Sequence, residues 1–410
     1  MDHVKAPRLA PSPPQISPGT ILLLAAACGL IVANIYYAQP LIGPIAQSLG
    51  LAPQAAGLIV TMSQIGYGAG LMFIVPLGDL IENRRLVLAS LALSAIALAA
   101  AAFAPSAAAF LVCAGAIGLG SVAVQILVPL AAHLAPDATR ERVVGMVSSG
   151  LMIGIILARP VSSFIAAQSS WRAVFVASAA MMVALAAVLS RALPVRAPDT
   201  RMTYRALIAS MARLAAATPI LRRRAFYQAC RFFAFSLFWT TTPLLLAGPD
   251  YRMTQRGIAL FGLAGVSGAI AAPIAGGLAD RGFSRPATGA AITLVAVAFI
   301  ATMMTGQGSS LALATLVGAA VAVDFGVQAN VVLGLRAIFA LAPEARGRLN
   351  GVYIATFFAA GALGSAVGAW ACARGGWPLA SRIGLALPLI ALARFVFRLV
   401  AGRRSPLPPP

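Results

Sequence analysis

The sequence is poor in charged residues, and acidic residues are the scarcest of them. Only 10% of its 410 residues are charged, with 10 acidic side chains against 30 lysines and arginines. A soluble domain is about one quarter charged and about half apolar, whereas 60% of this chain is apolar. A water-soluble fold cannot hide that much apolar surface. We therefore expect the chain to lie in a lipid bilayer.

Histidine and cysteine are also scarce, with 2 and 4 copies. The cysteines lie far apart inside apolar segments, which predicts free buried thiols and no disulfide or metal site; they are Cys28, Cys113, Cys230 and Cys372. No cluster of Cys, His or paired carboxylates can be assembled, so we do not expect an enzyme. No Gly-x-x-x-x-Gly-Lys-Ser/Thr loop occurs either, which disfavours direct coupling to ATP. No cofactor is expected.

What the sequence does contain is a series of apolar runs, and a spanning helix needs about 20 such residues. We predict twelve spans, at roughly 19–43, 55–79, 86–105, 107–134, 144–167, 172–193, 225–248, 257–279, 287–306, 309–335, 351–372 and 379–401. A basic stretch separates the two sets of six. The prediction is therefore a tail at 1–18, a six-helix bundle at 19–193, a basic linker at 194–224, a second six-helix bundle at 225–401 and a tail at 402–410. The N-terminal tail lacks the pattern of a signal peptide and is expected to be disordered.

The basic residues lie in the short breaks between the apolar runs. The net charge of +20 therefore does not indicate a nucleic-acid partner, which needs a basic face on a folded domain. Eight arginines lie between Arg191 and Arg224, whereas the opposite loops hold five: Arg172, Arg252, Arg256, Arg374 and Arg382. This asymmetry predicts that both termini lie on the cytoplasmic side of a bacterial inner membrane. Within the linker, Leu207–Ala217 is too short to span and is expected to form an interfacial helix.

The two sets of spans share an internal duplication. Asp79 corresponds to Asp280 at an offset of 201 positions, and Gln125 corresponds to Gln328 at an offset of 203. Trp171 and Trp377, which open the last span of each set, are 206 positions apart. Two halves repeated in parallel, with a substrate site between them near the membrane midplane, form a known transporter plan.

The loops after the second and eighth spans carry a family motif. GGLADRGFSR matches most of the pattern Gly-x-Leu-Ala-Asp-Arg-x-Gly-Arg-Arg, and VPLGDLIENRR keeps its aspartate and a basic pair. With these motifs and the duplication, the chain resembles the Major Facilitator Superfamily over nearly its whole length. The resemblance implies an all-α membrane protein of twelve helices in two pseudo-symmetric bundles. It also implies a cytoplasmic gate formed by Asp79, Arg84, Arg85, Gly276, Asp280 and Arg281. The alternative for the basic pair is that it only sets the orientation in the membrane.

The segment ANIYYAQPLIGPIAQSLGL is similar to the first span of the drug and metabolite efflux branch of this family. Its polar groups and those of the corresponding span of the second half suit a cavity for an amphipathic small molecule. The cavity candidates are Asn34, Tyr37, Gln125, Gln328, Ser236 and Trp239. The alternative is that Tyr36 and Trp239 belong to the aromatic belt at the outer membrane surface.

The fifth span both keeps and breaks the pattern of efflux members. Gly150 and Gly154 keep the four-residue spacing that lets two helices pack closely. Where those members carry Gly-Pro, this chain has Ala158 and Arg159, with Pro160 one place late. This departure weakens an antiport assignment, and it places an arginine inside the bilayer.

Asp324 is the sole acidic residue deep inside a predicted span. A charge at the bilayer centre costs about 2.5–3.5 kcal/mol on insertion scales, so it should face a cavity or a partner. We predict Asp324 and Arg159 as proton-coupling residues, since burial favours the protonated form of a carboxyl group. The alternative is an ion pair that merely joins the two halves. Arg231, about seven residues inside its span, is expected to reach the cytosolic surface and to be structural.

The sequence thus predicts a secondary active transporter of a small molecule, driven by protons and working by alternating access, with efflux favoured over uptake. The expected partners are a small-molecule substrate, protons and the lipid bilayer, and the expected state is a monomer. An uptake symporter is the first alternative. A receptor or scaffold on the same bundle is the second, although no long soluble sensory segment supports it. A membrane-embedded enzyme is disfavoured because a catalytic cluster is missing.

Overall fold

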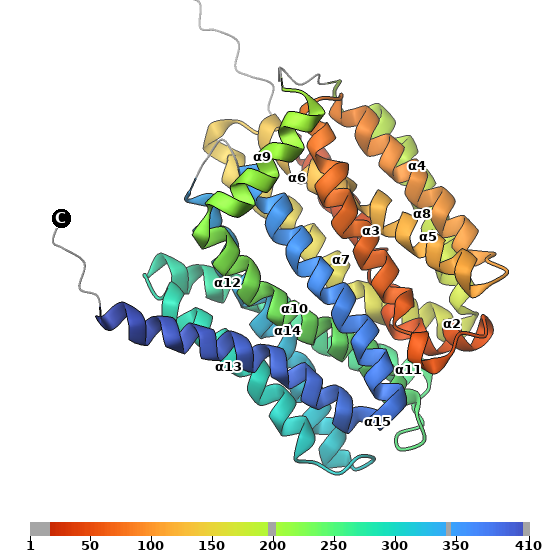
Figure 1. Cartoon of the computed structure of the whole chain (residues 1–410). Helices are drawn as coiled ribbons and strands as arrows, with labels where there is room; N and C mark the ends of the chain where they lie inside the picture. Colours follow the sequence, from red (N-terminus) through yellow and green to blue (C-terminus); the bar gives the residue numbers. More distant parts are fainter. Residues whose placement is uncertain (1–16, 196–201, 342–345, 405–410) are drawn as a thin grey trace, which may run out of the picture.

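The computed structural model of the chain describes residues 17–195, 202–341 and 346–404, with side chains as far as Ala401. Most of the two predicted tails, 1–18 and 402–410, lies outside these ranges. Within them the chain is entirely helical, with turns and short 3-10 segments between the helices. The expectation of an all-α membrane protein is confirmed (Figure 1).

The first half contains eight helices, and two of its spans are each built from two helices in succession. The helices are α1 (Pro18–Ala33), α2 (Ile42–Ser48), α3 (Leu58–Phe73), α4 (Asn83–Ala102), α5 (Ala107–Gly120), α6 (Val124–Leu134), α7 (Arg140–Gln168) and α8 (Trp171–Ala192). Serine side chains cap several helix starts: Ser106 accepts a hydrogen bond from the backbone of α5, and Ser170 accepts one from that of α8. Such caps satisfy backbone donors that have no partner within the helix.

The second half contains α10 (Pro219–Ala247), α11 (Gln255–Gly262), α12 (Ser267–Asp280), α13 (Ser284–Met303), α14 (Ser310–Phe339) and α15 (Arg346–Arg404). The long α15 is interrupted at Gly375 and Gly376, and the φ of Gly376 is 61°. Glycine adopts this left-handed conformation without strain, and Pro378 then suits the start of the next helix. The chain therefore reverses direction here, and α15 supplies the last two spans.

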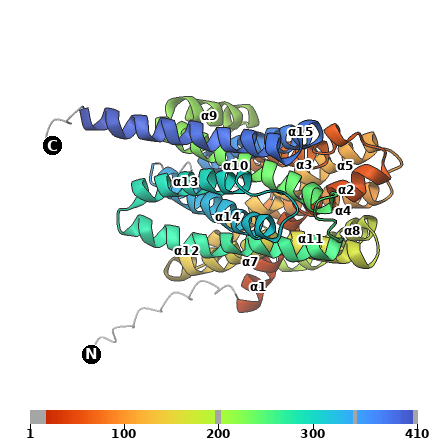
Figure 2. The same cartoon turned by 90° about the horizontal axis from the view of Figure 1, so that it is seen from below.

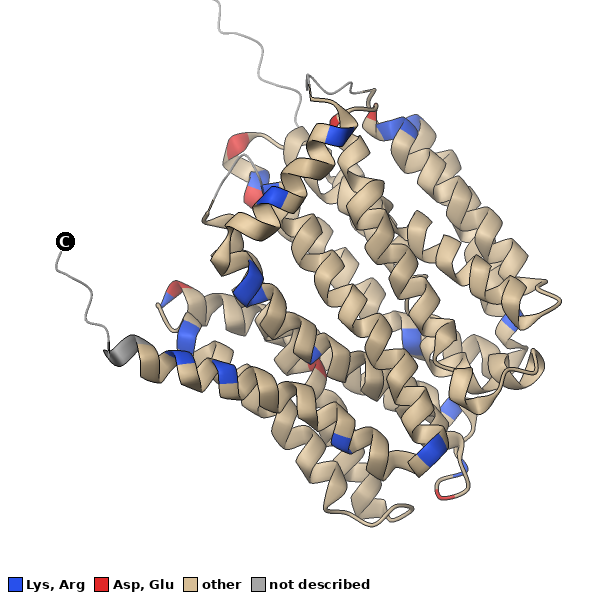
Figure 3. Cartoon of the chain, viewed as in Figure 1, with Lys and Arg blue, Asp and Glu red and all other residues tan. Residues whose placement is uncertain are grey.

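Ten segments of the described chain are long and apolar enough to cross a membrane. The last of them is broken at Gly375–Gly376 and crosses twice, and α1 with α2 supplies a further crossing. The twelve predicted spans are thereby confirmed. Figure 3 shows that the charged residues gather mainly toward the ends of the helices, as expected for a bundle whose middle faces lipid.

The two halves pack mostly within themselves and meet along two seams. In the first half α1 packs on α7, α3 on α5 and α4 on α8, whereas in the second half α14 packs on α12 and α13. One seam joins α3 to α15 and the other joins α7 to α11, as the ribbons in Figures 1 and 2 show. These seams are formed by the second, eleventh, fifth and eighth spans, so they are related by the internal duplication.

Close packing of α1 against α7 depends on glycine, as the four-residue spacing predicted. A Cβ atom on Gly154 would lie 2.2 Å from the carbonyl oxygen of Gly29, and one on Gly150 would lie 2.2 Å from that of Ala25. These distances are far below van der Waals contact. The two helices can therefore approach this closely only where side chains are absent.

A short helix, α9 (Tyr204–Ala217), precedes the second half and begins three residues before the predicted interfacial segment. The hydroxyl of Tyr204 donates a hydrogen bond of 2.9 Å to the carbonyl of Phe73, and Arg348 donates one of 3.0 Å to Ser210 of α9. Helix α9 thus crosses the ends of α3 and α15, one from each half. We call this end of the molecule the α9 end and the opposite one the far end.

Candidate functional site

A buried ion pair joins the two halves. Arg159 of α7 is 2% exposed and Asp324 of α14 is 7% exposed, and 3.7 Å separates Arg159 Nη1 from Asp324 Oδ1. The sequence predicts both residues at membrane depth, and the structure brings them into contact. The arrangement is compatible both with the ion-pair alternative and with a coupling role, because a pair that links two moving bodies must break when they separate.

Two further side chains hold the pair in place. Arg159 Nε donates a hydrogen bond of 2.8 Å to Gln39 Oε1, and Trp239 Nε1 donates one of 2.6 Å to Asp324 Oδ2. The guanidinium carbon of Arg159 also lies 4.1 Å from the centre of the Trp239 ring, a cation–π contact. Gln39 was not among the predicted site residues. The sequence indicated Gln39 only by its position, about one helical turn after Tyr36 in the same segment.

The backbone of the second half covers the pair. A Cβ atom on Gly265 would lie 3.1 Å from Arg159 Nη1 and 3.3 Å from Asp324 Oδ1, so a side chain there would press on both charges. Nearer the far end, Arg256 donates a hydrogen bond of 3.1 Å to Gln168 across the same seam. The halves are therefore closed against each other at this end.

The pair leaves hydrogen-bonding capacity unused. Among the described residues, neither Nη1 nor Nη2 of Arg159 has a hydrogen-bond partner, and Gln39 Nε2 has none. Removing one member of a buried ion pair typically costs about 3–5 kcal/mol, because the other charge is left without compensation. The cluster thus combines a high cost of disruption with buried donors that lack a hydrogen-bond partner.

The aromatic-belt alternative is wrong for both residues to which it applied. Trp239 is 2% exposed and Tyr36 is 4% exposed, so neither reaches the membrane surface. The physical reason is that Trp239 lies on α10, which α14 and α15 of its own half and α2 of the first half cover, and that the centre of the Tyr36 ring lies 5.4 Å from the buried guanidinium carbon of Arg159. Trp239 instead contacts Arg159 and Asp324.

Asn34 and Tyr37 lie apart from the ion pair. Asn34 accepts a hydrogen bond of 2.5 Å from Ser178 and donates one of 3.3 Å to the sulfur of Met182, both on α8. In this conformation Asn34 is therefore a packing residue of the first bundle, since the end of α1 turns its amide toward α8. Tyr37 is half-buried and packs against the apolar core.

Ser236 and Gln328 connect the halves at two other points. Gln64 of α3 donates a hydrogen bond of 2.9 Å to Ser236 of α10. Gln328 of α14 donates one of 2.7 Å to the sulfur of Met152 of α7. Both predicted cavity residues thus lie on the surface that separates the bundles.

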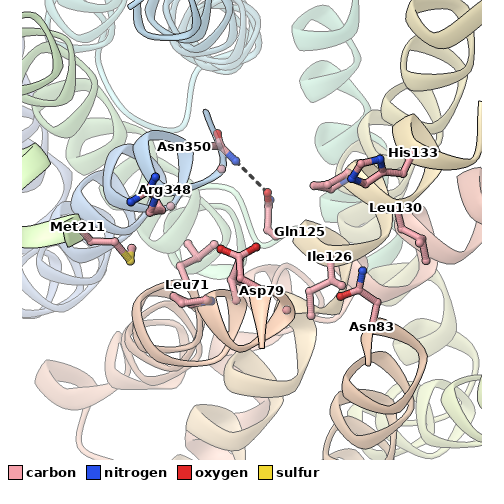
Figure 4. A pocket seen from close by; sticks show the side chains of 16 residues that line it. Leu71, Asp79, Asn83, Gln125, Ile126, Leu130, His133, Met211, Arg348 and Asn350 are labelled. Carbon is pink, nitrogen blue, oxygen red and sulfur yellow. Dashed lines mark hydrogen bonds between the residues drawn. The ribbon is translucent and has the colours of Figure 1, made fainter. Parts of the chain in front are cut away.

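A cavity of about 280 Å³ opens between the halves toward the α9 end. Asp79 and Gln125 line it from the first half, and Arg348 and Asn350 line it from α15 (Figure 4). Asn350 donates a hydrogen bond of 3.2 Å to Gln125, which donates one of 3.0 Å to Tyr67. Of the predicted cavity residues, Gln125 is the one that lines this cavity.

The predicted gate residues form local contacts in this conformation. Asp280 pairs with Arg336 of α14 and not with Arg281. Gly276 lies directly beside Arg336, because a Cβ atom there would be 3.3 Å from Arg336 Nη2.

In the first half, the neighbouring loop also forms its contact locally. Arg85 Nε lies 2.8 Å from Glu82, and Arg84 begins the same helix, α4. Among the described residues, Asp79 has no ion-pair partner within 4 Å. It faces the cavity instead (Figure 4).

The expectation that Arg231 reaches the cytosolic surface is wrong. Its side chain is 0% exposed. The reason is that α10 and α15 pack along much of their length, so Arg231 lies between helices and has no path to water.

The model of the Major Facilitator Superfamily matches residues 22–323 and 225–410 of this chain. YgaY of Escherichia coli, named as an uncharacterized putative transporter, is 39% identical over 378 residues, which cover 92% of this chain and 95% of that protein. SCO4007 of Streptomyces coelicolor, named as a probable transporter, is 36% identical over 87% of this chain and 82% of its own length. The crystal structure of the nucleoside transporter NupG superposes with a TM-score of 0.74 at 13% identity, covering 92% of this chain and 99% of NupG. At that identity the likeness concerns the fold.

Proposed function

Because the chain belongs to the Major Facilitator Superfamily, and is thus a multi-pass membrane transporter, we propose that it moves a small molecule by proton-driven alternating access, with efflux favoured over uptake. The observation that carries the proposal is the buried Arg159–Asp324 pair between the two halves. The pair lies where the halves are closed, and the cavity lies toward the other end.

The coupling follows from what must happen when the far end opens. The α7–α11 seam must part, so Arg159 leaves Asp324. A buried carboxylate that has lost its cation and meets water takes up a proton readily. When the seam closes again, Arg159 favours the ionised carboxylate and the proton leaves toward the α9 end. Each cycle thus moves one proton across the pair.

Closure of the α9 end would bring other charges together. Asp79 lines the cavity from the first half and Arg348 lines it from the second (Figure 4). We infer that these two side chains approach each other when the cavity closes, since opposite charges that face across a shrinking space attract. This gives Asp79 the gate role that the family motif implies.

Replacing Asp324 with Asn should abolish gradient-driven transport and spare exchange of substrate. The amide keeps the shape but cannot titrate, so the proton step is lost while substrate can still cross. A deletion strain and an overexpressing strain grown on a wide compound panel would identify a transported compound. Purified wild-type and variant proteins in liposomes would then be compared with and without a pH gradient.

Asp250→Asn, an exposed loop residue, is the matched control and should transport normally. Undiminished gradient-driven transport by Asp324→Asn would eliminate the coupling role. The direction of the pH gradient that drives transport distinguishes efflux from uptake. In efflux by antiport the compound and the protons move in opposite directions, whereas in uptake by symport they move in the same direction.

We further propose that the α9 end faces the cytoplasm, in a bacterial inner membrane, because the loops there hold most of the arginines. In a protein without its native cysteines, single cysteines at the exposed positions Arg205 and Arg222 should react with an impermeant reagent only after the cells are opened. A cysteine at Arg374, exposed near the reversal of α15, should react in intact cells. Labelling of position 205 in intact cells would reverse the orientation.

A further inference from the structure

Arg231 of α10 is a buried cation without a counter-charge. Its side chain is 0% exposed, and none of its three guanidinium nitrogens has a hydrogen-bond partner among the described residues. Unlike Arg159, it has no carboxylate within 4 Å in the part of the chain that the structure describes. A buried unpaired charge is costly, so a group that supplies the missing negative charge would be bound strongly.

The polar side chains near Arg231 come from three helices, and we call them the Arg231 cluster. Arg224, Gln228 and Arg231 recur along one face of α10 at helical spacing. Gln228 accepts a hydrogen bond of 2.6 Å from Asn330 of α14. Tyr353 of α15 comes against Gly334 of α14, where a Cβ atom would lie 2.3 Å from the tyrosine oxygen. The tyrosine hydroxyl is within electrostatic range of both arginines.

The groups of the Arg231 cluster that lack a hydrogen-bond partner are mostly donors. Besides Arg231, Gln228 Nε2 and Arg224 Nε lack a partner among the described residues, as does the hydroxyl of Tyr353. The unused acceptor beside them is Asn330 Oδ1. Two positive charges and an excess of N–H groups match an anion with several acceptor oxygens, and a planar guanidinium matches a carboxylate best.

A series of aromatic rings joins the Arg231 cluster to the ion pair, beginning with Tyr353, whose ring centre lies 5.5 Å from that of Phe357. Phe232, next to Arg231, stacks on Phe235 with ring centres 5.2 Å apart and lies 4.8 Å from Phe357. Phe235 in turn lies 5.1 Å from the guanidinium carbon of Arg159. A molecule with an anionic group and an apolar or aromatic body would fit here, with the anionic group at the arginines and the body against the aromatic rings.

We propose that the transported substrate is an amphipathic organic anion whose charged group binds Arg231, with Arg224, Gln228 and Tyr353 around it. Gly351, which lines the cavity at the α9 end, lies two residues before Tyr353 on the same helix, α15. The inference names the substrate class of the proposed transporter and so rests on that proposed function. It does not depend on proton coupling.

Thermal unfolding of the purified full-length protein at constant ionic strength tests the anion site. The probes are two matched sets: benzoate, benzamide and benzylammonium, and 2-naphthoate with its amide and its aminomethyl analogue. At millimolar concentration the carboxylates should raise the unfolding temperature, because a ligand that binds the folded state stabilises it. The amides and ammonium compounds should not. No stabilisation by either carboxylate, or equal stabilisation by the neutral amides, overturns the proposal.

Substitution assigns the site to Arg231. Arg231→Met should bind the carboxylates at least about tenfold more weakly, and Arg231→Lys should bind with intermediate strength because it keeps the charge but loses the planar fork. Without any probe, Arg231→Met should unfold at a higher temperature than the wild type, since an uncompensated buried charge is gone. Arg382→Met, which removes an exposed arginine from α15, is the control and should behave as wild type. Unchanged carboxylate binding by Arg231→Met contradicts the assignment.

Two more arms separate the sources of an effect. Raising the concentration of sodium chloride without any probe shows whether a small inorganic anion gives the full stabilisation, and that result would overturn an organic substrate. Asp250→Asn, the exposed loop variant, should bind the carboxylates as the wild type does. If the carboxylates bind but transport is not coupled to protons, the proposed coupling is refuted and this inference stands. If transport is coupled to protons but the carboxylates do not bind, the inference alone is refuted.

Discussion

Arg159→Ala should lose nearly all transport. The substitution removes the partner of Asp324, the hydrogen bond to Gln39 and the cation–π contact with Trp239. It also leaves a buried carboxylate without its cation, which typically costs about 3–5 kcal/mol. Uptake and efflux of the transported compound in liposomes would measure the loss, with thermal unfolding as a check that the variant folds. Normal transport by Arg159→Ala would refute a functional role.

Arg159→Lys should fold and yet lose much of the transport. Lysine keeps the positive charge, so the carboxylate stays compensated. It cannot, however, donate to Gln39 and approach Asp324 at once with a planar fork. Arg172→Ala is the control, since Arg172 is a partly exposed arginine on the same half and its side chain bonds Ser48 at the surface. It should leave transport unchanged.

The double variant Arg159→Met with Asp324→Asn separates assembly from function. Replacing both members of a buried ion pair with neutral groups is often neutral for stability, or even stabilising. If the pair merely joined the halves, this double variant would fold and transport normally. We expect it to fold as well as the wild type and to show no gradient-driven transport. Recovery of that transport would establish the assembly role and refute proton coupling through the pair.

Gly154→Val should prevent correct folding of the first bundle. Its new Cβ atom alone would lie 2.2 Å from the carbonyl oxygen of Gly29 and 2.4 Å from the Cα atom of that residue. The obstacle is backbone, which cannot rotate away, so α1 and α7 must separate along their length. The yield of monodisperse protein and its unfolding temperature measure the effect, and both should fall sharply.

Gly145→Ala in the same helix is the matched control. A Cβ atom there would meet nothing within 4 Å, and Gly145 is exposed. Alanine favours a helix over glycine by roughly 0.5–1 kcal/mol, so this variant should be as stable as the wild type or slightly more so. Equal stability of Gly154→Val and Gly145→Ala would show that α1 and α7 do not pack as described.

The fold was predictable because its determinants are local or compositional. A bilayer demands runs of about 20 apolar residues whose backbone groups are satisfied within a helix, and the sequence displays twelve of them. The duplication follows from matched pairs such as Trp171 and Trp377. The close packing at Gly150 and Gly154 follows from spacing alone, because a pattern of small residues needs no knowledge of the partner helix to indicate a contact.

The site was predictable only in part, for the same physical reason. The free-energy cost of placing a charge inside a bilayer identified Asp324 and Arg159 as candidate functional residues. The periodicity of the sequence, however, does not indicate which helices contact each other. The tertiary structure decided that α7 and α14 bring these two charges to 3.7 Å and that Gln39 and Trp239 complete the cluster.

Tertiary packing also decided the surroundings of two polar residues that the sequence had singled out. Asn34 turns toward α8, and Arg231 lies between α10 and its neighbours, away from water. The sequence by itself determined which residues lie in the membrane, since hydrophobicity is a property of each residue and its near neighbours. Which polar groups face one another there depends on the tilt and rotation of whole helices, and these are set by packing between segments far apart in the chain.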